Sequence, residues 1–255
     1  MKTFEVHRKV KDNVGDYYCN PGRYFDFPEY TSGELVNNSF PVTNEILVIG
    51  GGGLIHKKFS KNIDALLNKK PKHSVLWGIG HNFGKKHVTK SSTDVYYPNW
   101  INKCSLVGIR DWIDGHYDSY LPCVSCMHPA FDKTYEVKHD VVYYTHKFKS
   151  KYQHQDGHVQ MANNHLNFDE VIDFLGSANT IITDSYHGAY WGQLLGKDVR
   201  VLSWSVKFNH MKYQPTFIPH ISQWQETSPS TVVDNYLEEC RDYNNKFYQK
   251  FLNLL

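Results

Sequence analysis

Residues 180–202 contain a histidine whose position indicates chemistry more clearly than any other part of the sequence. Two adjacent isoleucines predict a short buried strand, and apolar residues at helical spacing follow it. His187 and the small Gly188 fall at the junction, where backbone N–H groups lack partners and the helix dipole attracts anions. We expect a phosphate or carboxylate site there, with Ser185 beside it. The alternative is a helix capped by Ser185 or Asp184, with the histidine incidental.

Three further loops with anion-binding residue types follow predicted strands. Ligands of open parallel sheets bind outside the carboxyl ends of the strands, so we expect these loops to share one crevice with His187. Glycines let an anion approach the backbone, and a guanidinium matches phosphate or carboxylate. Ordinary turns and an Arg110–Asp111 ion pair are the structural alternatives. The candidate binding residues in these loops are Gly51, Gly52, Gly53, His81 and Arg110.

An amino-terminal segment, residues 13–23, is rich in Asn, Gly and Pro and has no hydrophobic period. This composition predicts a loop, which we expect to line the same crevice. Asp16, next to Gly15 and followed by two tyrosines, is a candidate carboxylate base. The alternative is an ordinary turn residue.

Several motifs of cofactor and metal chemistry do not occur in the sequence. The glycine loops do not spell the dinucleotide fingerprint, and there is no P-loop, D-x-D motif or nucleophile elbow. Cys123 and Cys126 form one C-x-x-C pair, whereas a structural zinc site uses four ligands. We therefore expect thiols there, no bound metal and no cofactor.

The elements that position these residues repeat the order strand, glycine loop, helix. Such a repeat predicts a parallel α/β sheet. Proline and mixed charge suggest a linker at 123–139, after which the pattern restarts. We expect an α/β fold of two Rossmann-like domains facing a cleft, residues 1–130 and 131–255. The predicted elements are strands at 45–49, 74–77, 105–109, 141–144, 181–182 and 199–202, helices capped by Ser60 and Asn167, a short helix after Asp111, the helix after His187, and a long carboxy-terminal helix after Pro229.

Composition narrows the class of protein. The 255 residues are 40% hydrophobic and 21% charged, which is typical of a soluble globular chain. A net charge of +2 with dispersed lysines argues against nucleic-acid binding. We see no export signal and no apolar run of about 18 residues, so we expect a cytoplasmic protein without a transmembrane segment.

Taken together, these pieces resemble the polysaccharide pyruvyltransferase family. The matching segments are Asn13-Val-Gly-Asp16, Leu47-Val-Ile-Gly-Gly-Gly-Gly53, Gly78-Ile-Gly80, Val107-Gly-Ile-Arg-Asp111, Thr183-Asp-Ser-Tyr-His-Gly188 and Leu195-Gly-Lys197. The R-D and H-G elements are the most specific of these. Where this chain has Ser185, the family more often has an arginine.

The resemblance implies a compact GT-B-like fold and a metal-independent reaction. The pyruvyl group of phosphoenolpyruvate is transferred to two hydroxyls of a sugar of a cell-surface polysaccharide or its precursor, forming a cyclic ketal. Arg110 and His187 then bind the donor phosphate and carboxylate, and His187 also transfers a proton. Asp16 is the base for the acceptor hydroxyl, and Lys207 stands where the family often has a lysine.

Two other functions remain open from the sequence. One is a GT-B-type glycosyltransferase that uses a sugar nucleotide, and the other is a non-catalytic glycan-binding protein that uses its aromatic residues. The expected partners are phosphoenolpyruvate and a glycan acceptor, free or lipid-linked. Peripheral membrane contact and homo-oligomerisation are both compatible with the sequence.

Overall fold

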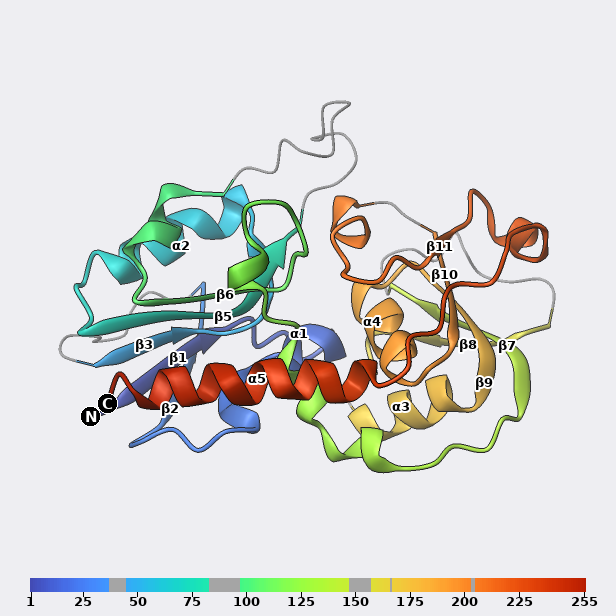
Figure 1. Cartoon of the computed structure of the whole chain (residues 1–255), viewed down its shortest axis with the longest axis horizontal. Coiled ribbons are helices and arrows are strands. Elements are labelled where there is room, and N and C mark those ends of the chain that lie inside the picture. The colour runs from blue at the N-terminus through green and yellow to red at the C-terminus, as the bar shows by residue number, and fades with distance from the viewer. Residues whose placement is uncertain (37–44, 83–96, 147–156, 166, 203–204) are drawn as a thin grey trace.

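Two parallel β-sheets with helices packed on them make up the molecule (Figure 1). The computed structural model describes residues 1–36, 45–82, 97–146, 157–165, 167–202 and 205–255. Every strand pairing is parallel, as the sequence predicted. The first sheet has the order β2-β1-β3-β5-β4, with β6 pairing β5, and the second has the order β11-β10-β9-β7-β8.

The strands are β1 (Thr3–His7), β2 (Thr31–Glu34), β3 (Ile46–Ile49), β4 (Gly52–Ile55), β5 (His73–His81), β6 (Leu106–Ile109), β7 (His139–Thr145), β8 (Val159–Ala162), β9 (Ala178–Thr183), β10 (Asp198–Val201) and β11 (Thr216–Phe217). The α-helices are α1 (Val14–Tyr18), α2 (Lys57–Leu67), α3 (Phe168–Gly176), α4 (Tyr186–Leu194) and α5 (Tyr236–Leu252). Short 3₁₀ helices include η1 (Pro21–Arg23), η3 (Asn99–Lys103), η4 (Tyr117–Ser119), η5 (Val124–Met127), η6 (Pro129–Asp132), η8 (Val206–Phe208) and η9 (Ile221–Glu226).

Both faces of the first sheet are buried, each against a different helix. Side chains alternate between the faces of a strand, so neighbouring residues of β3 enter different cores. Leu47 packs in the core that contains Ile63 of α2, whereas Val48 packs in the core that contains Phe251 of α5. This two-sided burial explains why β3 is a continuous apolar run rather than an alternating one.

The second sheet follows the same plan. Its larger core packs Val142 of β7 and Ile181 of β9 against α3 and α4. Asn167 caps α3 and accepts a hydrogen bond from the Glu170 N–H, as the sequence predicted. Gly196 ends the turn after α4 with a φ of +65°, a backbone conformation that favours glycine. Strand β9 runs almost directly into α4, and His187 lies in the first turn of that helix.

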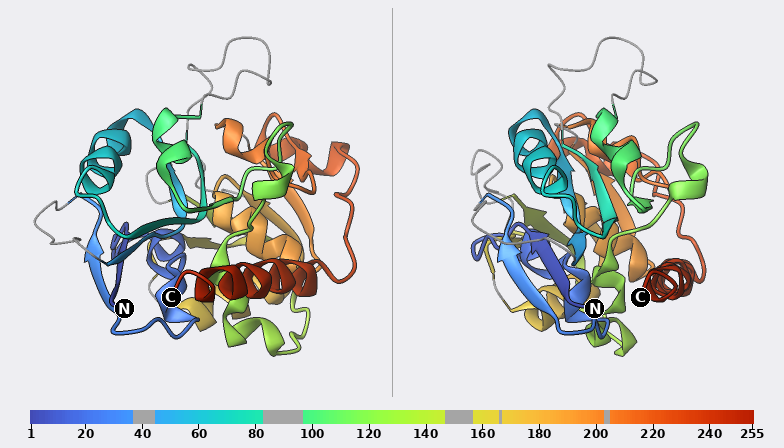
Figure 2. Two further views of the ribbon diagram at one scale, coloured as in Figure 1. Left: turned by 60° about the vertical axis from the view of Figure 1, so that its left-hand side comes forward. Right: turned by 90° about the vertical axis from the view of Figure 1, so that its left-hand side faces the viewer.

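Helix α5 extends along both halves of the molecule (Figures 1 and 2). Tyr236 and Cys240, near its beginning, pack in the core of the second sheet. Phe247 and Phe251, near its end, pack in the core of the first sheet. The carboxy-terminal helix thus contributes to both cores, and the division of the chain near residue 130 stays a prediction.

Strand β1, inside the first sheet, has no counterpart among the predicted elements. Only Phe4 and Val6 of its residues are large and apolar. Glu5 and His7 are buried as a pair, with Glu5 Oε1 2.8 Å from His7 Nδ1. Charged residues rarely occupy the interior of a sheet, so a hydrophobic pattern search passes over this strand.

Several predicted boundaries are wrong. Residues 13–23 were expected to be a loop outside the core, but they contain α1 and η1, and Val14 is fully buried. Residues 123–139, expected to be a linker, begin with η5 and η6, which are packed in the core. Helix α2 is capped by His56 rather than Ser60. The short helix expected after Asp111 is the 3₁₀ helix η4, which begins only at Tyr117.

Other predicted strands are confirmed with shifted ends. The glycine loop expected at 78–82 is largely the end of β5, and that expected at 50–53 runs into β4.

No helix within the described residues is long and apolar enough to cross a membrane.

Candidate functional site

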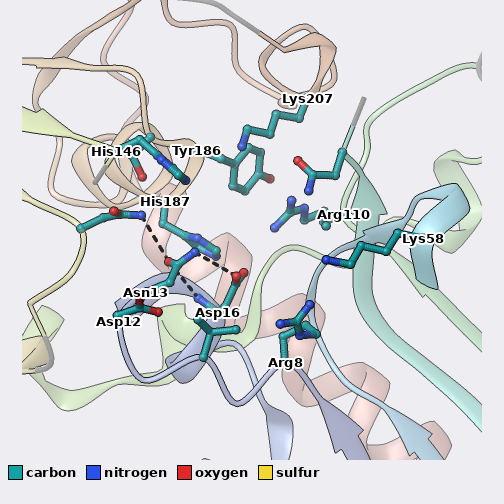
Figure 3. Close-up of a pocket in the computed structure, with 15 residues that line it drawn as sticks. Arg8, Asp12, Asn13, Asp16, Lys58, Arg110, His146, Tyr186, His187 and Lys207 are labelled. Carbon is teal, nitrogen blue, oxygen red and sulfur yellow. Dashed lines mark hydrogen bonds between the residues drawn. The ribbon is translucent and has the colours of Figure 1, made fainter. Parts of the chain in front are cut away.

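A cavity of about 460 Å³ opens between the two halves and is lined by both. Parallel strands of the two sheets end near it, in agreement with the general placement of ligand sites in such folds. Its side chains are predominantly polar or charged (Figure 3). The lining residues are Arg8, Val10, Asp12, Asn13, Asp16, Gly53, Lys58, Asn82, Arg110, His146, Asn163, Ser185, Tyr186, His187 and Lys207.

Most of the predicted site residues meet at this cavity. The structure brings together Asp16, Gly53, Arg110, Ser185, His187 and Lys207. Gly51, Gly52, His81 and Gly188 do not line it. A Cβ atom at Gly51 would overlap the Cys19 carbonyl and one at Gly188 would overlap Tyr144, so both positions require close packing. A ligand-binding role for these four residues stays a prediction.

His187 is held on two sides by the other half of the molecule. Its Nε2 lies 3.6 Å from Sγ of Cys123. A Cβ atom at Gly15 of α1 would overlap its Nδ1, so the ring packs directly on the helix backbone. Burial, reinforced by the positive charges of Arg110 and Lys207, lowers the pKa of His187 well below its usual value. The histidine is therefore neutral at pH 7.

Cys123 completes the surroundings of the His187 ring. Burial raises the pKa of the Cys123 thiol, although hydrogen bonding to Ser125 and the charge of Arg110 oppose that shift. The thiol therefore stays protonated at neutral pH, and its environment is not that of a nucleophilic cysteine. The two cysteines of the C-x-x-C pair are free and buried.

Arg110 presents an unsatisfied positive charge to the cavity. The residue is 3% exposed, and its Nε and Nη1 atoms have no hydrogen-bond partner within the described part of the chain. Its guanidinium carbon lies 3.8 Å from the centroid of the Tyr186 ring. Burial opposes the charge, but Tyr186, Asp111 and neighbouring thiols outweigh it and raise the pKa of Arg110. A buried, charged and incompletely bonded guanidinium is suited to an anionic ligand.

The structural alternative for this loop, an ion pair between the Arg110 and Asp111 side chains, does not form. Asp111 instead accepts hydrogen bonds from the backbone N–H of His81 at 2.8 Å and from its ring at 2.7 Å. Arg110 is thus left to face the cavity, while Asp111 turns toward His81. Burial opposes ionisation of Asp111, but His81 and the charges of His210 and Arg110 lower its pKa.

Asp16 is positioned by two asparagines. The Asn13 side chain caps α1, and its Nδ2 donates a 2.9 Å hydrogen bond to Oδ2 of Asp16. Asn163, which follows β8 in the second half, donates to Oδ1 of Asn13 at 3.3 Å. Figure 3 shows the hydrogen bond between Asn13 and Asp16 beside His187. The carboxylate is therefore fixed by contacts from both halves.

Ser185 is both a helix cap and a cavity residue. Its Oγ accepts a hydrogen bond from the Gly188 N–H at 3.4 Å. The expected helix cap is confirmed at Ser185, so the Gly188 N–H is already paired. The neighbouring Asp184 accepts from the His146 N–H at 2.6 Å and fixes another part of the cavity wall.

The charges of the lining favour anions. Four cationic side chains, Arg8, Lys58, Arg110 and Lys207, and two carboxylates, Asp12 and Asp16, line the cavity, a formal surplus of two positive charges. Arg8 is also paired with Glu34 at 2.9 Å, so Lys58, Arg110 and Lys207 carry most of that surplus. No sequence pattern singled out Arg8 or Lys58. Arg8 follows the unrecognised strand β1, and Lys58 lies in the first turn of α2, so finding β1 and its carboxyl end would have located Arg8.

Comparison with known proteins bears on the fold. No protein-family model matches the sequence, and no curated protein matches it. Among solved structures, an uncharacterized protein from Klebsiella pneumoniae subsp. pneumoniae NTUH-K2044 is similar, with 17% sequence identity and a TM-score of 0.50. The match covers 85% of this chain and 92% of that one. At this identity the likeness supports the α/β fold alone.

Proposed function

We propose that the protein transfers the pyruvyl group of phosphoenolpyruvate to two hydroxyls of a sugar. The observation that carries this proposal is the pairing of a buried, incompletely bonded Arg110 with a neutral His187 in one cavity. The resemblance of the sequence motifs to polysaccharide pyruvyltransferases supplies the reaction class. We further propose that the two halves are Rossmann-like domains in a compact GT-B-type arrangement.

The donor matches the charge of the site. Phosphoenolpyruvate carries a phosphate and a carboxylate, and both anions form strong charge-assisted hydrogen bonds with guanidinium groups. Arg110 and Lys207 hold these two groups on the side of the cavity formed with Tyr186. The Ser185 hydroxyl stands where the family more often has an arginine, so these two cations supply the positive charge.

Donor binding prepares His187 for proton transfer. Positive charges contribute to its lowered pKa, and the bound anion offsets them. His187 then takes up a proton and delivers it to the methylene carbon of the donor. A histidine that becomes cationic only beside the substrate is suited to general acid catalysis.

Asp16 acts on the acceptor. It removes the proton of the first sugar hydroxyl while the hydroxyl oxygen attacks C2 of the donor, whose C3 becomes a methyl group. The C2–O bond to phosphate then breaks, the second hydroxyl adds to C2, and its proton leaves with the phosphate or the solvent. Asp16 then releases its proton to the solvent, which balances the proton that His187 took up. The products are one cyclic ketal and one inorganic phosphate, so atoms and charge balance.

The test is turnover with a panel of sugars. The protein is incubated with phosphoenolpyruvate carrying ¹³C at C2 and with glycans that offer pairs of neighbouring hydroxyls. We expect a new ketal carbon by NMR and one phosphate released per ketal. Phosphate release without a ketal, or no reaction and no thermal stabilisation by phosphoenolpyruvate, contradicts the proposal.

Parallel incubations distinguish the two alternatives. UDP- and CMP-sugars replace phosphoenolpyruvate in one series, and glycans are added without a donor in another. Turnover of a sugar nucleotide would establish a glycosyltransferase instead. Glycan binding that survives both Arg110→Ala and His187→Ala, with no turnover, would establish a glycan-binding protein.

A further inference from the structure

Three buried residues outside the cavity form a second cluster of potential ligands. His81 ends β5, Asp111 follows β6, and His210 lies in the turn after η8. A ligand atom from each of the three lies within 4.8 Å of the others. We propose that this cluster binds one divalent transition-metal ion, with Zn²⁺ as the first candidate.

The chemistry of the three side chains fits such an ion. Two imidazoles and one carboxylate form a donor set used by zinc and by iron(II). All three residues are almost completely buried, with exposed fractions of 0%, 1% and 4% for His81, Asp111 and His210. A metal ion supplies the positive charge that balances a buried carboxylate.

An unsatisfied nitrogen is the second observation that points to a ligand. Nδ1 of His210 is buried and has no hydrogen-bond partner in the part of the chain that the structure describes. Buried polar atoms almost always have a partner, so an unpaired imidazole nitrogen on a residue of this cluster calls for an explanation. A bound metal ion satisfies it.

The geometry requires only a small adjustment. Ligand atoms that lie about 2.1 Å from one ion are roughly 3 to 4 Å apart. His81 Nδ1 and Asp111 Oδ2 are 2.7 Å apart and share a proton. The ion takes the place of that proton, which is released to the solvent, and His210 moves inward to complete the set.

The proposed metal site connects the two halves of the chain, and its ligand Asp111 is the residue that follows Arg110. His81 and Asp111 belong to the first sheet, whereas His210 follows the second-sheet strand β10. The backbone already connects the same segments, because the Trp112 N–H donates to the His210 carbonyl at 2.8 Å. The metal therefore positions the Arg110 loop without entering the cavity, and the inference does not depend on the proposed function.

The experiment measures metal content and stability of the full chain without a histidine tag. The protein is stripped with a chelator, incubated with Zn²⁺ or Co²⁺, desalted and analysed by mass spectrometry. We expect one ion per chain, a melting temperature that rises with the logarithm of metal concentration, and a visible Co²⁺ spectrum of nitrogen and oxygen ligands.

Two variants locate the site. His210→Ala should lose the stoichiometric ion and the thermal shift, whereas His73→Ala, at the opposite end of β5, should keep both. If His210→Ala does not fold, X-ray absorption of the wild-type cobalt form tests for two imidazole ligands. No stoichiometric metal in the wild type, metal binding unchanged in His210→Ala, or a spectrum without imidazole ligands would overturn the inference.

Discussion

The imidazole of His187 rests on the backbone of Gly15, where the Cβ of any other residue would overlap Nδ1. Gly15 belongs to α1 of the first half and His187 to α4 of the second. The two halves therefore meet at the residue proposed to transfer the proton. Any change that separates α1 from α4 also displaces Asp16, which lies one residue after Gly15.

The first prediction concerns this contact. Gly15→Ala introduces a methyl group against the His187 ring, and such overpacking typically destabilises by about 1–3 kcal/mol. Alanine is a better helix former than glycine by about 1 kcal/mol, and this gain offsets part of the loss. We expect turnover to fall by more than the loss of folded protein accounts for. Turnover and urea unfolding of the same variant measure the two effects.

A double-mutant cycle provides the control for that contact. In a His187→Ala background the methyl group meets no ring, so Gly15→Ala should then be neutral or stabilising. Equal destabilisation in both backgrounds would show that the overlap with His187 is not the cause.

The second prediction concerns Arg110. Met is unbranched and uncharged and replaces the apolar part of the arginine side chain, so Arg110→Met removes a buried, incompletely bonded cation. An unsatisfied buried polar group costs about 1–3 kcal/mol, and we expect the free variant to be more stable by an amount in that range. The same variant should no longer be stabilised by phosphoenolpyruvate, because the charge that destabilises the free protein is the charge that binds the ligand.

Arg23→Met is the matched control for Arg110→Met. Arg23 is exposed, lies over the rings of Tyr17 and Tyr18, and does not line the cavity. Its replacement should leave the thermal shift with phosphoenolpyruvate intact. An Arg110→Met variant that is still stabilised as strongly as the wild type would exclude Arg110 from the binding site.

The third prediction is a pH dependence. The folded pKa of His187 is lowered, so below the ordinary histidine pKa of about 6.5 the unfolded chain binds a proton that the folded chain does not. The free energy of unfolding should therefore fall as pH decreases from 6.5 toward the folded pKa, and this contribution should vanish above 6.5. His187→Gln should make the fall shallower, as measured by urea unfolding across pH.

Phosphoenolpyruvate should change that profile as well. The bound anion offsets the charges of Arg110 and Lys207, so the His187 pKa rises and binding takes up a proton near neutral pH. Calorimetric titration in buffers of different ionisation enthalpy measures this uptake. Uptake that persists undiminished in His187→Gln would assign the proton to another group.

Sequence patterns predicted much of this site. Glycine loops and apolar strands identified the parallel sheets, and the rule that ligands bind at strand ends grouped Arg110, Ser185 and His187, which line one cavity. Asp16 was expected there from the amino-terminal segment, and Lys207 from the family resemblance alone. Gly15 was noted only as part of the segment Asn13-Val-Gly-Asp16. Its requirement for close approach to His187 depends on tertiary packing between helices distant in the sequence.

What the sequence could not predict has physical causes. Strand β1 contains the buried Glu5–His7 pair, which masks its strand pattern and with it the position of Arg8. The cluster of His81, Asp111 and His210 joins residues far apart in the chain, so no local spacing reveals it. Residues 123–139 have the composition of a linker, but their 3₁₀ turns are packed between the two sheets and α5.

The fourth prediction concerns α5. The Trp77 indole N–H donates a 2.9 Å hydrogen bond to Oδ1 of Asn244, and both side chains are fully buried. Asn244→Leu leaves this donor unpaired, which should cost about 1–3 kcal/mol. The adjacent Asn245 is exposed, so Asn245→Leu should change the urea midpoint little. Equal effects of the two substitutions would contradict the proposed role of Asn244.

The central claim is that the cavity between the two halves is a phosphoenolpyruvate site built on Arg110 and His187. Calorimetric titration of the wild type with phosphoenolpyruvate, repeated with Arg110→Met, tests it most directly. We predict one ligand per chain in the wild type and at least a tenfold weaker affinity in the variant, about 1.4 kcal/mol. No binding to the wild type, or equal affinity in both proteins, would contradict the claim.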